Sequence, residues 1–213
     1  MKLYFLPFVF LTMLNSFGQK WQPIDEKIMS RWAKKVTPDN VWQEYPRPQF
    51  ERSLWKNLNG IWDYTILKSN QPKPKSFEGK ILVPFSFESA LSGVGKSITP
   101  EDKMWYRKKF SIPSEWKGKR ILVNFEAVDH DTNVWINGIF VGSHQGGFDR
   151  FSFDITPFLN GSGSQIIVVS EARICASKGR QIGPRWTVRT CGPRRRARRG
   201  PAQLPARCRR PGT

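Results

Sequence analysis

The chain has 213 residues, of which 38% are hydrophobic and 13% aromatic, enough to build the core of one domain. Its formal net charge of +18 would by itself suggest a nucleic-acid or anionic-membrane partner. The distribution argues against that, because residues 1–170 carry 22 Lys and Arg against 16 Asp and Glu, whereas residues 171–213 carry 13 against one. For the body of the protein we therefore expect no nucleic-acid partner.

The first residues predict an export signal. Lys2 precedes a mostly apolar run from Leu3 to Leu14, which is too short to span a bilayer. Small residues then precede a cleavage site after Gly18. We expect residues 1–18 to be a signal peptide and the mature protein to be periplasmic or secreted. The alternative is a buried N-terminal helix.

Residues 19–48 predict a short helix followed by an extended arm. Ile24, Ile28, Trp32 and Val36 recur every four residues, as on one face of an amphipathic helix, and a following proline would end it. The prolines of "EYPRPQ" require extended backbone before them, so this arm is expected to lie across the domain surface.

Residues 49–171 contain short alternating segments that predict strands. The expected strands are Gly60–Leu67, Lys80–Phe87, Met104–Pro113, Lys119–Val128, 133–138, 139–144, 150–159 and Gln165–Glu171. Seven or eight strands with regularly spaced turns indicate an all-β, antiparallel jelly-roll β-sandwich. Pro84 makes its strand an edge or a bulged strand.

Two local signals predict turns between the later strands. Asn137-Gly138 predicts a two-residue hairpin turn, because a type I′ turn needs positive φ at both positions. Asp154 is placed to cap the turn at Thr156-Pro157. Between them, "GSHQGGFDR" predicts a polar loop at one end of the sandwich, where two glycines let the backbone turn.

The last part of the chain, residues 172–213, differs from the body in composition. Lys outnumbers Arg 16 to 6 up to residue 170, and afterwards Arg outnumbers Lys 12 to 1. The shift from residues with A/T-rich codons to residues with G/C-rich codons suggests that the true frame or gene ends near Ser170 or Glu171. The alternative is a functional basic tail that binds phosphates. Having few apolar groups, the tail is expected to be disordered.

Cysteines support no structural prediction. Cys175, Cys191 and Cys208 all lie in the tail, and their spacings match neither a metal site nor an even set of disulfides.

The body resembles the N-terminal sugar-binding domain of glycoside hydrolase family 2, the β-galactosidase and β-glucuronidase family. The resemblance covers most of residues 30–170 and is carried by "RWAKKVTPDNVWQEYPRPQ", "NLNGIWDY", "ILVPFSFESALSGVG" and "WYRKKFSIPSEWKGKRILVNFEAVDHDTNVWINGIFVGSHQGGFDRFSFDIT". It implies a galactose-binding-like jelly roll that such enzymes join to an immunoglobulin-like domain and a TIM barrel. The barrel holds the two catalytic glutamates, and neither can be assigned to any residue of this chain.

The resemblance also implies a site. The candidate sugar-binding residues are His144, Gln145, Asp149 and Arg150, with the first two favoured for hydrogen bonds to the sugar. The alternative is that their loop only shapes a turn or packs against another domain. Trp105 and Tyr106 either line the same end or, as we favour, belong to the core.

Other reactive groups are not expected to act in catalysis or metal binding. Glu126, Asp129 and Asp131 cluster beside His130, but acids at a strand exit are more often turn formers than paired catalysts. His130 and His144 are the only histidines and lack a ligand spacing. No phosphate loop or nucleophile elbow is present in the sequence, so no metal or other cofactor is expected.

The expected function is therefore the carbohydrate-binding domain of an exported family 2 enzyme that hydrolyses β-glycosides, with this chain alone inactive. The first alternative is a free-standing carbohydrate-binding module. The second is a nucleic-acid binder that acts through its basic tail.

Overall fold

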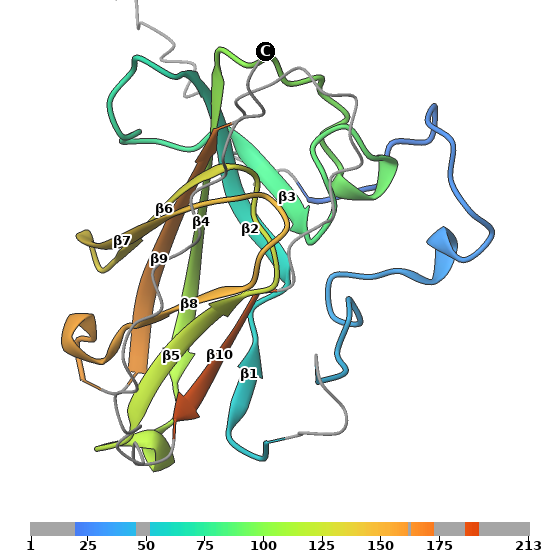
Figure 1. The fold of residues 1–213 in the computed structure, drawn as a ribbon. Coiled ribbons are helices and arrows are strands. Elements are labelled where there is room, and N and C mark those ends of the chain that lie inside the picture. Colours follow the sequence, from blue (N-terminus) through green and yellow to red (C-terminus); the bar gives the residue numbers. More distant parts are fainter. Residues whose placement is uncertain (1–19, 46–51, 162, 173–185, 192–213) are drawn as a thin grey trace, which may run out of the picture.

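The computed structural model describes residues 20–45, 52–161 and 163–172, together with the backbone of 186–191. These residues form two antiparallel sheets that pack face to face, with the N-terminal arm at one side (Figure 1). The described helical turns are 3-10 turns of three residues each: η1 (Ala33–Lys35), η3 (Ala90–Ser92), η4 (Ser114–Trp116) and η5 (Thr156–Phe158). The expected all-β antiparallel sandwich is confirmed. Within this part of the chain no helix has the length and apolarity to cross a bilayer.

The six-stranded sheet consists of β2 (Gly60–Lys68), β3 (Gly79–Val83), β4 (Asp102–Ile112), β6 (Asp131–Ile136), β7 (Ile139–Gln145) and β9 (Gly163–Ala172), in the order β3-β2-β4-β9-β6-β7. The other sheet consists of β1 (Trp55–Asn57), β5 (Arg120–Phe125), β8 (Phe151–Asp154) and β10 (Trp186–Cys191), in the order β1-β10-β5-β8. β3 is an edge strand that ends just before Pro84, as its proline predicts.

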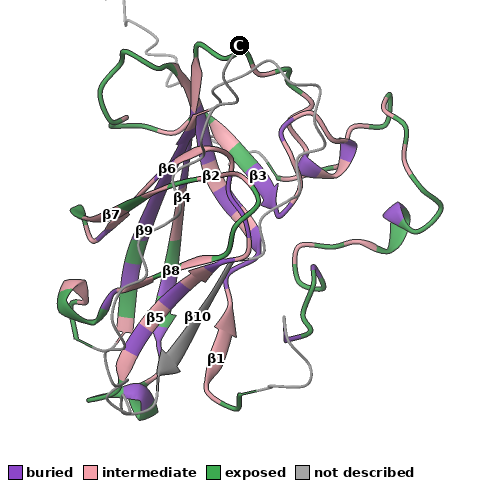
Figure 2. Cartoon of the chain, viewed as in Figure 1, coloured by how far each residue is buried: buried purple, intermediate pink, exposed green. Residues whose placement is uncertain are grey.

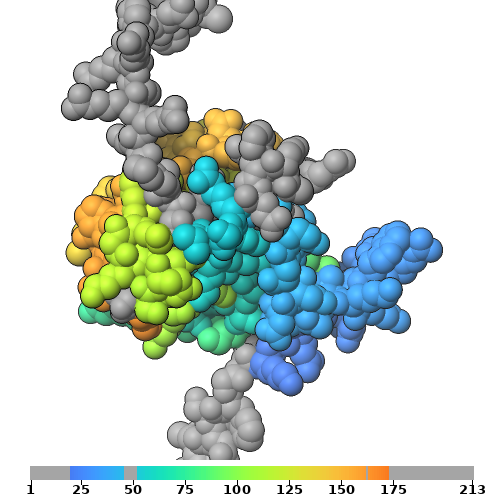
Figure 3. Space-filling view, turned by 90° about the horizontal axis from the view of Figure 1, so that it is seen from below, coloured from blue at the N-terminus to red at the C-terminus, as the bar shows by residue number. Residues whose placement is uncertain are grey.

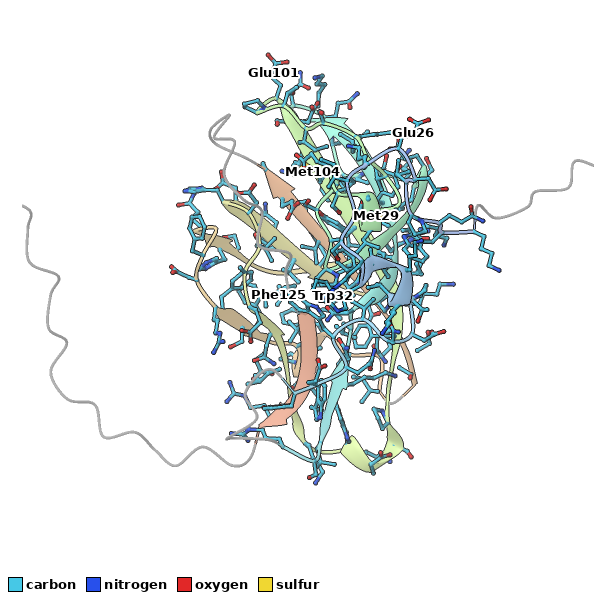
Figure 4. All side chains as sticks on the ribbon, turned by 90° about the vertical axis from the view of Figure 1, so that its right-hand side faces the viewer. Glu26, Met29, Trp32, Glu101, Met104 and Phe125 are labelled. Atoms are coloured by element: carbon cyan, nitrogen blue, oxygen red, sulfur yellow. The ribbon has the colours of Figure 1, made fainter. Side chains whose placement is uncertain are left out.

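The core lies between the two sheets because alternate residues of each strand are apolar and face inward. On β5, Ile121, Val123 and Phe125 are buried and their neighbours are only half-buried. Met104 from β4 and Phe125 from β5 belong to the same core cluster and come from opposite sheets (Figure 4). Figure 2 shows buried segments along β2, β3, β5 and β9, whereas the arm is mostly exposed.

The hairpin between β6 and β7 is confirmed. Asn137 has φ 50° and Gly138 has φ 87°, the left-handed backbone that the turn requires. The Asn137 amide also donates to the Phe158 carbonyl at 2.9 Å and to Gln165 Oε1 at 2.7 Å, and its Oδ1 accepts from the Ile166 amide at 2.9 Å. The turn is therefore tied to β9 and to the β8–β9 connection.

The predicted cap at the end of β8 is also present. Asp154 Oδ1 accepts from the amide and the hydroxyl of Thr156 at 3.1 and 2.7 Å. Although partial burial raises the pKa of Asp154, these hydrogen bonds and the ion pair with Arg120 outweigh it and leave the pKa below its usual value.

The prediction of a helix over Ile24 to Val36 is wrong. Apart from η1 this segment is irregular, Ile28 is fully exposed and Trp32 is more than half exposed. Instead of bonding to itself, the segment bonds to the domain: the Ile24 amide donates to the Ala90 carbonyl at 3.0 Å, and Lys27 Nζ donates to the Glu88 carbonyl at 2.8 Å. The arm runs along the side of the body and projects from it (Figure 3).

The other end of the arm is also attached. Asn57 Nδ2 from β1 donates to the carbonyls of Val41 and Trp42 at 3.2 and 2.8 Å, and the Tyr45 ring meets Trp55 edge-on at 5.1 Å. The described residues 20–45 are thus bonded to the domain at both ends. Most of the arm expected at "EYPRPQ" lies outside the described residues, as does the expected signal peptide at 1–18.

Part of the tail is ordered, which corrects the expectation of disorder for these residues. β10 pairs with β5 on one side, from Trp186 opposite Phe125 to Cys191 opposite Arg120, and with β1 on the other. Among the described residues, β10 is the strand that joins β1 to β5. The remainder of the tail lies outside the described residues.

Candidate functional site

Two loops meet at one end of the sandwich. The β5–β6 loop (126–130) and the β7–β8 loop (146–150) are joined by a hydrogen bond from the Gly146 amide to the His130 carbonyl, 2.8 Å long. The point where a Cβ would lie on Gly147 is 3.5 Å from Oδ1 of Asp129. The structure therefore brings the acidic cluster of one loop beside the predicted polar loop.

His144 and Gln145 are the last residues of β7 rather than part of a loop, which corrects their expected placement. Because neighbouring strand residues point to opposite faces, the side chains of His144 and Gln145 lie on opposite sides of the sheet. The His144 ring faces inward and stacks on Phe151 at 4.1 Å and 16°. Gln145 lies on the opposite face and donates to Asp131 Oδ1 at 3.0 Å.

Asp149 and Arg150 lie on the exposed loop, as expected. Arg150 forms an ion pair with Glu126 at 2.5 Å. The Asp149 carboxylate lies 3.3 Å, and His144 Nε2 lies 3.5 Å, from the point where a Cβ on Gly146 would be. Gly146 has φ +126°, so a side chain there would be strained as well as crowded.

His144 Nε2 is buried and has no hydrogen-bond partner within the described structure. Phe148, which sequence reasoning missed, is 79% exposed between these polar residues. The sequence signal for Phe148 was a single aromatic residue between Gly147 and Asp149 in an otherwise polar loop. An exposed ring beside convergent polar groups suits a sugar, whose ring carbons are apolar and whose hydroxyls are not.

The acids nearby have structural partners. Glu126 binds Arg150, and Asp131 accepts from Gln145 and lies 3.6 Å from His130 Nδ1. In the described part of the chain, no three His, Cys, Asp or Glu side chains are grouped so that they could hold a metal ion.

Trp105 and Tyr106 do not line this surface. Tyr106 belongs to the core and its hydroxyl donates to Glu171 Oε1 at 2.6 Å. Burial, followed by the neighbouring Glu171 charge, raises the pKa of Tyr106 well above its usual value. Trp105 is buried too, on the opposite face of the same sheet.

A family model described as "Glycosyl hydrolases family 2, sugar binding domain" matches residues 55–181. The chain belongs to this family. The match ends beyond the boundary expected at residue 171, and the predicted resemblance is confirmed.

The similar curated proteins are longer enzymes. A Beta-glucuronidase of Formosa agariphila is 44% identical over 66 residues, 31% of this chain and 7% of that protein. Beta-galactosidase BoGH2A of Bacteroides ovatus is 35% identical over 123 residues, 58% of this chain and 13% of that protein. This family 2 domain thus spans a small part of the relatives that it matches.

Among solved structures, a Ruminococcus gnavus b-glucuronidase in complex with D-glucaro 1,5-lactone has the same fold. The TM-score is 0.50 at 20% identity, over 66% of this chain and 30% of that one. At this identity the likeness concerns the fold alone.

Proposed function

We propose that this domain is the N-terminal sugar-binding part of an exported enzyme that hydrolyses β-glycosides of the glucuronide or galactoside type. The family match over residues 55–181 carries the proposal. It is supported by relatives named Beta-glucuronidase and Beta-galactosidase that extend far beyond the matched segment. In such an enzyme the partners of this domain are an immunoglobulin-like domain and a catalytic barrel.

The contribution of this chain is the end of the sandwich, where the exposed Phe148 lies next to Asp149 and Arg150 in the loop that follows Gln145. The loops bring donors, acceptors and one apolar face within reach of one sugar unit. Since an open surface encloses little of a ligand, we expect dissociation constants in the millimolar range.

Cleavage is not expected from the chain itself. Hydrolysis of a glycoside needs one carboxylic acid and one carboxylate at a defined separation on either side of the bond. The acids that flank this surface are instead engaged: Glu126 with Arg150, and Asp131 with Gln145 and His130.

A hydrolysis assay tests whether the chain alone can cleave a glycoside. The purified chain, incubated with nitrophenyl β-galactoside and nitrophenyl β-glucuronide, should release no nitrophenol. Clear turnover that copurifies with the chain would overturn the proposal that catalysis belongs to another domain.

Ligand-observed NMR tests the sugar-binding part. Millimolar methyl β-glucuronide or β-galactoside should show saturation transfer from the chain, and Asp149→Ala with Arg150→Ala should reduce it severalfold. Glu115→Ala, an exposed acid on η4 at the other end of β5, is the matched control and should change nothing. Silence across galactosides, glucuronides and mannosides would refute sugar binding at this end.

Export has its own test. When the chain is expressed with its natural N-terminus in a Gram-negative host, mass spectrometry of the periplasmic protein should find cleavage after Gly18. An uncleaved chain retained in the cytoplasm would contradict export.

A further inference from the structure

The outer face of the six-stranded sheet, which points away from the core, carries a row of polar side chains. Residues directly opposite each other in antiparallel strands place their side chains on the same face. Thr65 lies opposite Trp105, Trp105 opposite Ser170, Ser170 opposite Asn133 and Asn133 opposite Ser143. This outer polar row therefore crosses the sheet from β2 to β7. Its sequence neighbours Tyr64, Tyr106, Val169 and Val134 all belong to the core.

Aromatic rings form a second row beside it. Trp135 on β6 lies 5.3 Å from Trp105 with 31° between the ring planes, and 5.6 Å from Phe140 on β7. Trp105 is 3% exposed, Trp135 is half-buried and Phe140 is 51% exposed. The three rings thus lead from the sheet surface into solvent.

Two polar groups at the buried end of these rows have no partner. Trp105 Nε1 and Ser170 Oγ, from residues 3% and 0% exposed, form no hydrogen bond within the described structure. Leaving a buried donor or acceptor unpaired costs free energy, so native structures seldom do it without a reason. Because the two residues lie opposite each other on β4 and β9, one ligand group can reach both.

Besides the paired Asp63 and Asp131, this face carries lysines. Lys73 Nζ lies 5.2 Å from the centre of the Trp135 ring, and Lys103 Nζ lies 5.5 Å from that of Trp105. Lys109 follows on the outward side of β4. None of these three amines forms an ion pair in the described part of the chain, and partial burial lowers the pKa of Lys73.

The loop from β2 to β3 reaches over the outer face, where it contacts Trp135 and Arg107, and it lies on the same side of the molecule as the β6–β7 hairpin (Figure 1). Residues 72–77 form no hydrogen bond with the rest of the described structure. The side-chain contacts of this segment include Lys73 on Trp135 and Phe77 beneath the Arg107 guanidinium at 4.3 Å. Contacts of this kind at exposed sites are weak, so the loop can lift at small cost.

We propose that the outer face is a second binding site, which takes an acidic oligosaccharide. One sugar ring stacks on Trp135 and Phe140, and hydroxyls of the next unit pair with Trp105 Nε1 and Ser170 Oγ once the loop has lifted. Lys73 and Lys103 meet the carboxylates. The site goes beyond the end of the sandwich and does not depend on it.

This assignment rests on three features together. Flat rings suit the apolar faces of sugar units. Neutral hydroxyl, amide and indole groups in a row suit their hydroxyls. The unpaired amines select an anionic chain over a neutral one.

The test is a titration of the full chain with a hexasaccharide of alternating glucuronic acid and N-acetylglucosamine, with neutral cellohexaose as the comparison. The indole Nε1–H signal of Trp105 should shift with the acidic probe and not with cellohexaose. Trp105→Phe and Ser170→Ala should each weaken binding about tenfold, the effect of one lost hydrogen bond. Ser170→Ala should leave the melting temperature unchanged, and Trp105→Phe should lower it only slightly, through its smaller ring. Equal binding of both probes, or full binding by both variants, would overturn the proposal.

A control at the other site separates the two proposals. Phe148→Ala should impair binding of simple sugars at the end of the sandwich and leave the acidic oligosaccharide bound. If Phe148→Ala abolishes binding of the acidic probe while Trp105→Phe does not, the outer face is not a site and the sandwich end accounts for all the binding.

Discussion

The two faces of the six-stranded sheet are built by the same strands, yet some of their most deeply buried polar groups differ in whether they are hydrogen-bonded. On the inner face, Thr132 donates to the Asp129 carbonyl at 3.1 Å and Glu171 accepts from Tyr106. On the outer face, Trp105 and Ser170 are equally buried and have no partner within the described structure. Polar groups that stabilise the fold are thus satisfied within it, and those left unsatisfied point to a ligand.

A pair of tryptophans shows the difference most directly. Trp62 on the inner face donates its Nε1–H to the Leu58 carbonyl at 2.8 Å and is almost completely buried in the core. Trp105 is buried to nearly the same extent, but its Nε1–H has no acceptor in the described residues. Substitutions at these two positions should therefore separate stability from binding.

The largest effect is expected on the inner face. Trp62→Ala should lower the free energy of unfolding by about 3–5 kcal/mol, because it leaves a cavity at the centre of the core. Urea unfolding measures this. Phe140→Ala, at the exposed end of the row of rings on the outer face, should cost less than about 1 kcal/mol. Equal losses at both positions would remove the distinction between the faces.

The next effect is expected where inner-face polar groups are tied to the hairpin. Asn137→Ala should lower the free energy of unfolding by about 2 kcal/mol, since it removes the bonds to Phe158, Gln165 and Ile166 at a position with positive φ. Asn70→Ala, in the exposed β2–β3 loop, serves as the control with no change. A stable Asn137→Ala variant would mean that the strands alone set the hairpin.

A smaller effect should appear in the pH dependence. Hydrogen bonds from Thr99 and the ion pair with Lys68 lower the pKa of Asp102 to about 2. A lowered folded-state pKa stabilises the fold above the unfolded value of about 3.9, and this contribution is lost as the pH falls toward 2. Asp102→Asn should therefore cost about 1 kcal/mol at pH 7 and clearly less at pH 2, where about half of the carboxylate is already protonated in the folded state. Denaturant unfolding at both values checks this, and an equal cost at both would rule out the charge as the cause.

The smallest effect is expected at the unpaired groups. Ser170→Ala should change the free energy of unfolding by less than about 0.5 kcal/mol, or raise it slightly, because no hydrogen bond is lost. Trp105→Phe should cost less than about 1 kcal/mol, through its smaller ring alone. Trp62→Phe should cost at least about 1 kcal/mol more than Trp105→Phe, since its indole also has an acceptor. Differential scanning fluorimetry compares the three variants. A loss in Trp105→Phe as large as that in Trp62→Phe would show that the Trp105 N–H is satisfied in solution.

Local patterns predicted the strands well. The expected strand at Gly60–Leu67 is β2 at Gly60–Lys68, and the one at Met104–Pro113 is β4 at Asp102–Ile112. Alternation is a property of the chain itself and is read directly from neighbouring residues. The four-residue spacing from Ile24 wrongly predicted a helix, because a short helix is stable only when its apolar face packs against a partner. Here the backbone found its partners on η3 instead.

The site was predicted in part. The sequence placed Asp149 and Arg150 correctly on an exposed loop. It did not show that the preceding strand extends through His144 to Gln145. Because β7 continues to Gln145, the two residues fall on opposite faces. No local signal shows where a strand stops pairing, since that depends on the neighbouring strand.

The sequence alone determined that the chain forms strands, where the hairpin turns, and to which family the domain belongs, because each of these is encoded in contiguous residues. Only the tertiary structure decided that β10 lies between β1 and β5, that the acidic loop meets the polar loop, and that Trp105 and Ser170 lie side by side unpaired. These features depend on contacts between segments far apart in the chain, which the order of residues in any one segment does not specify.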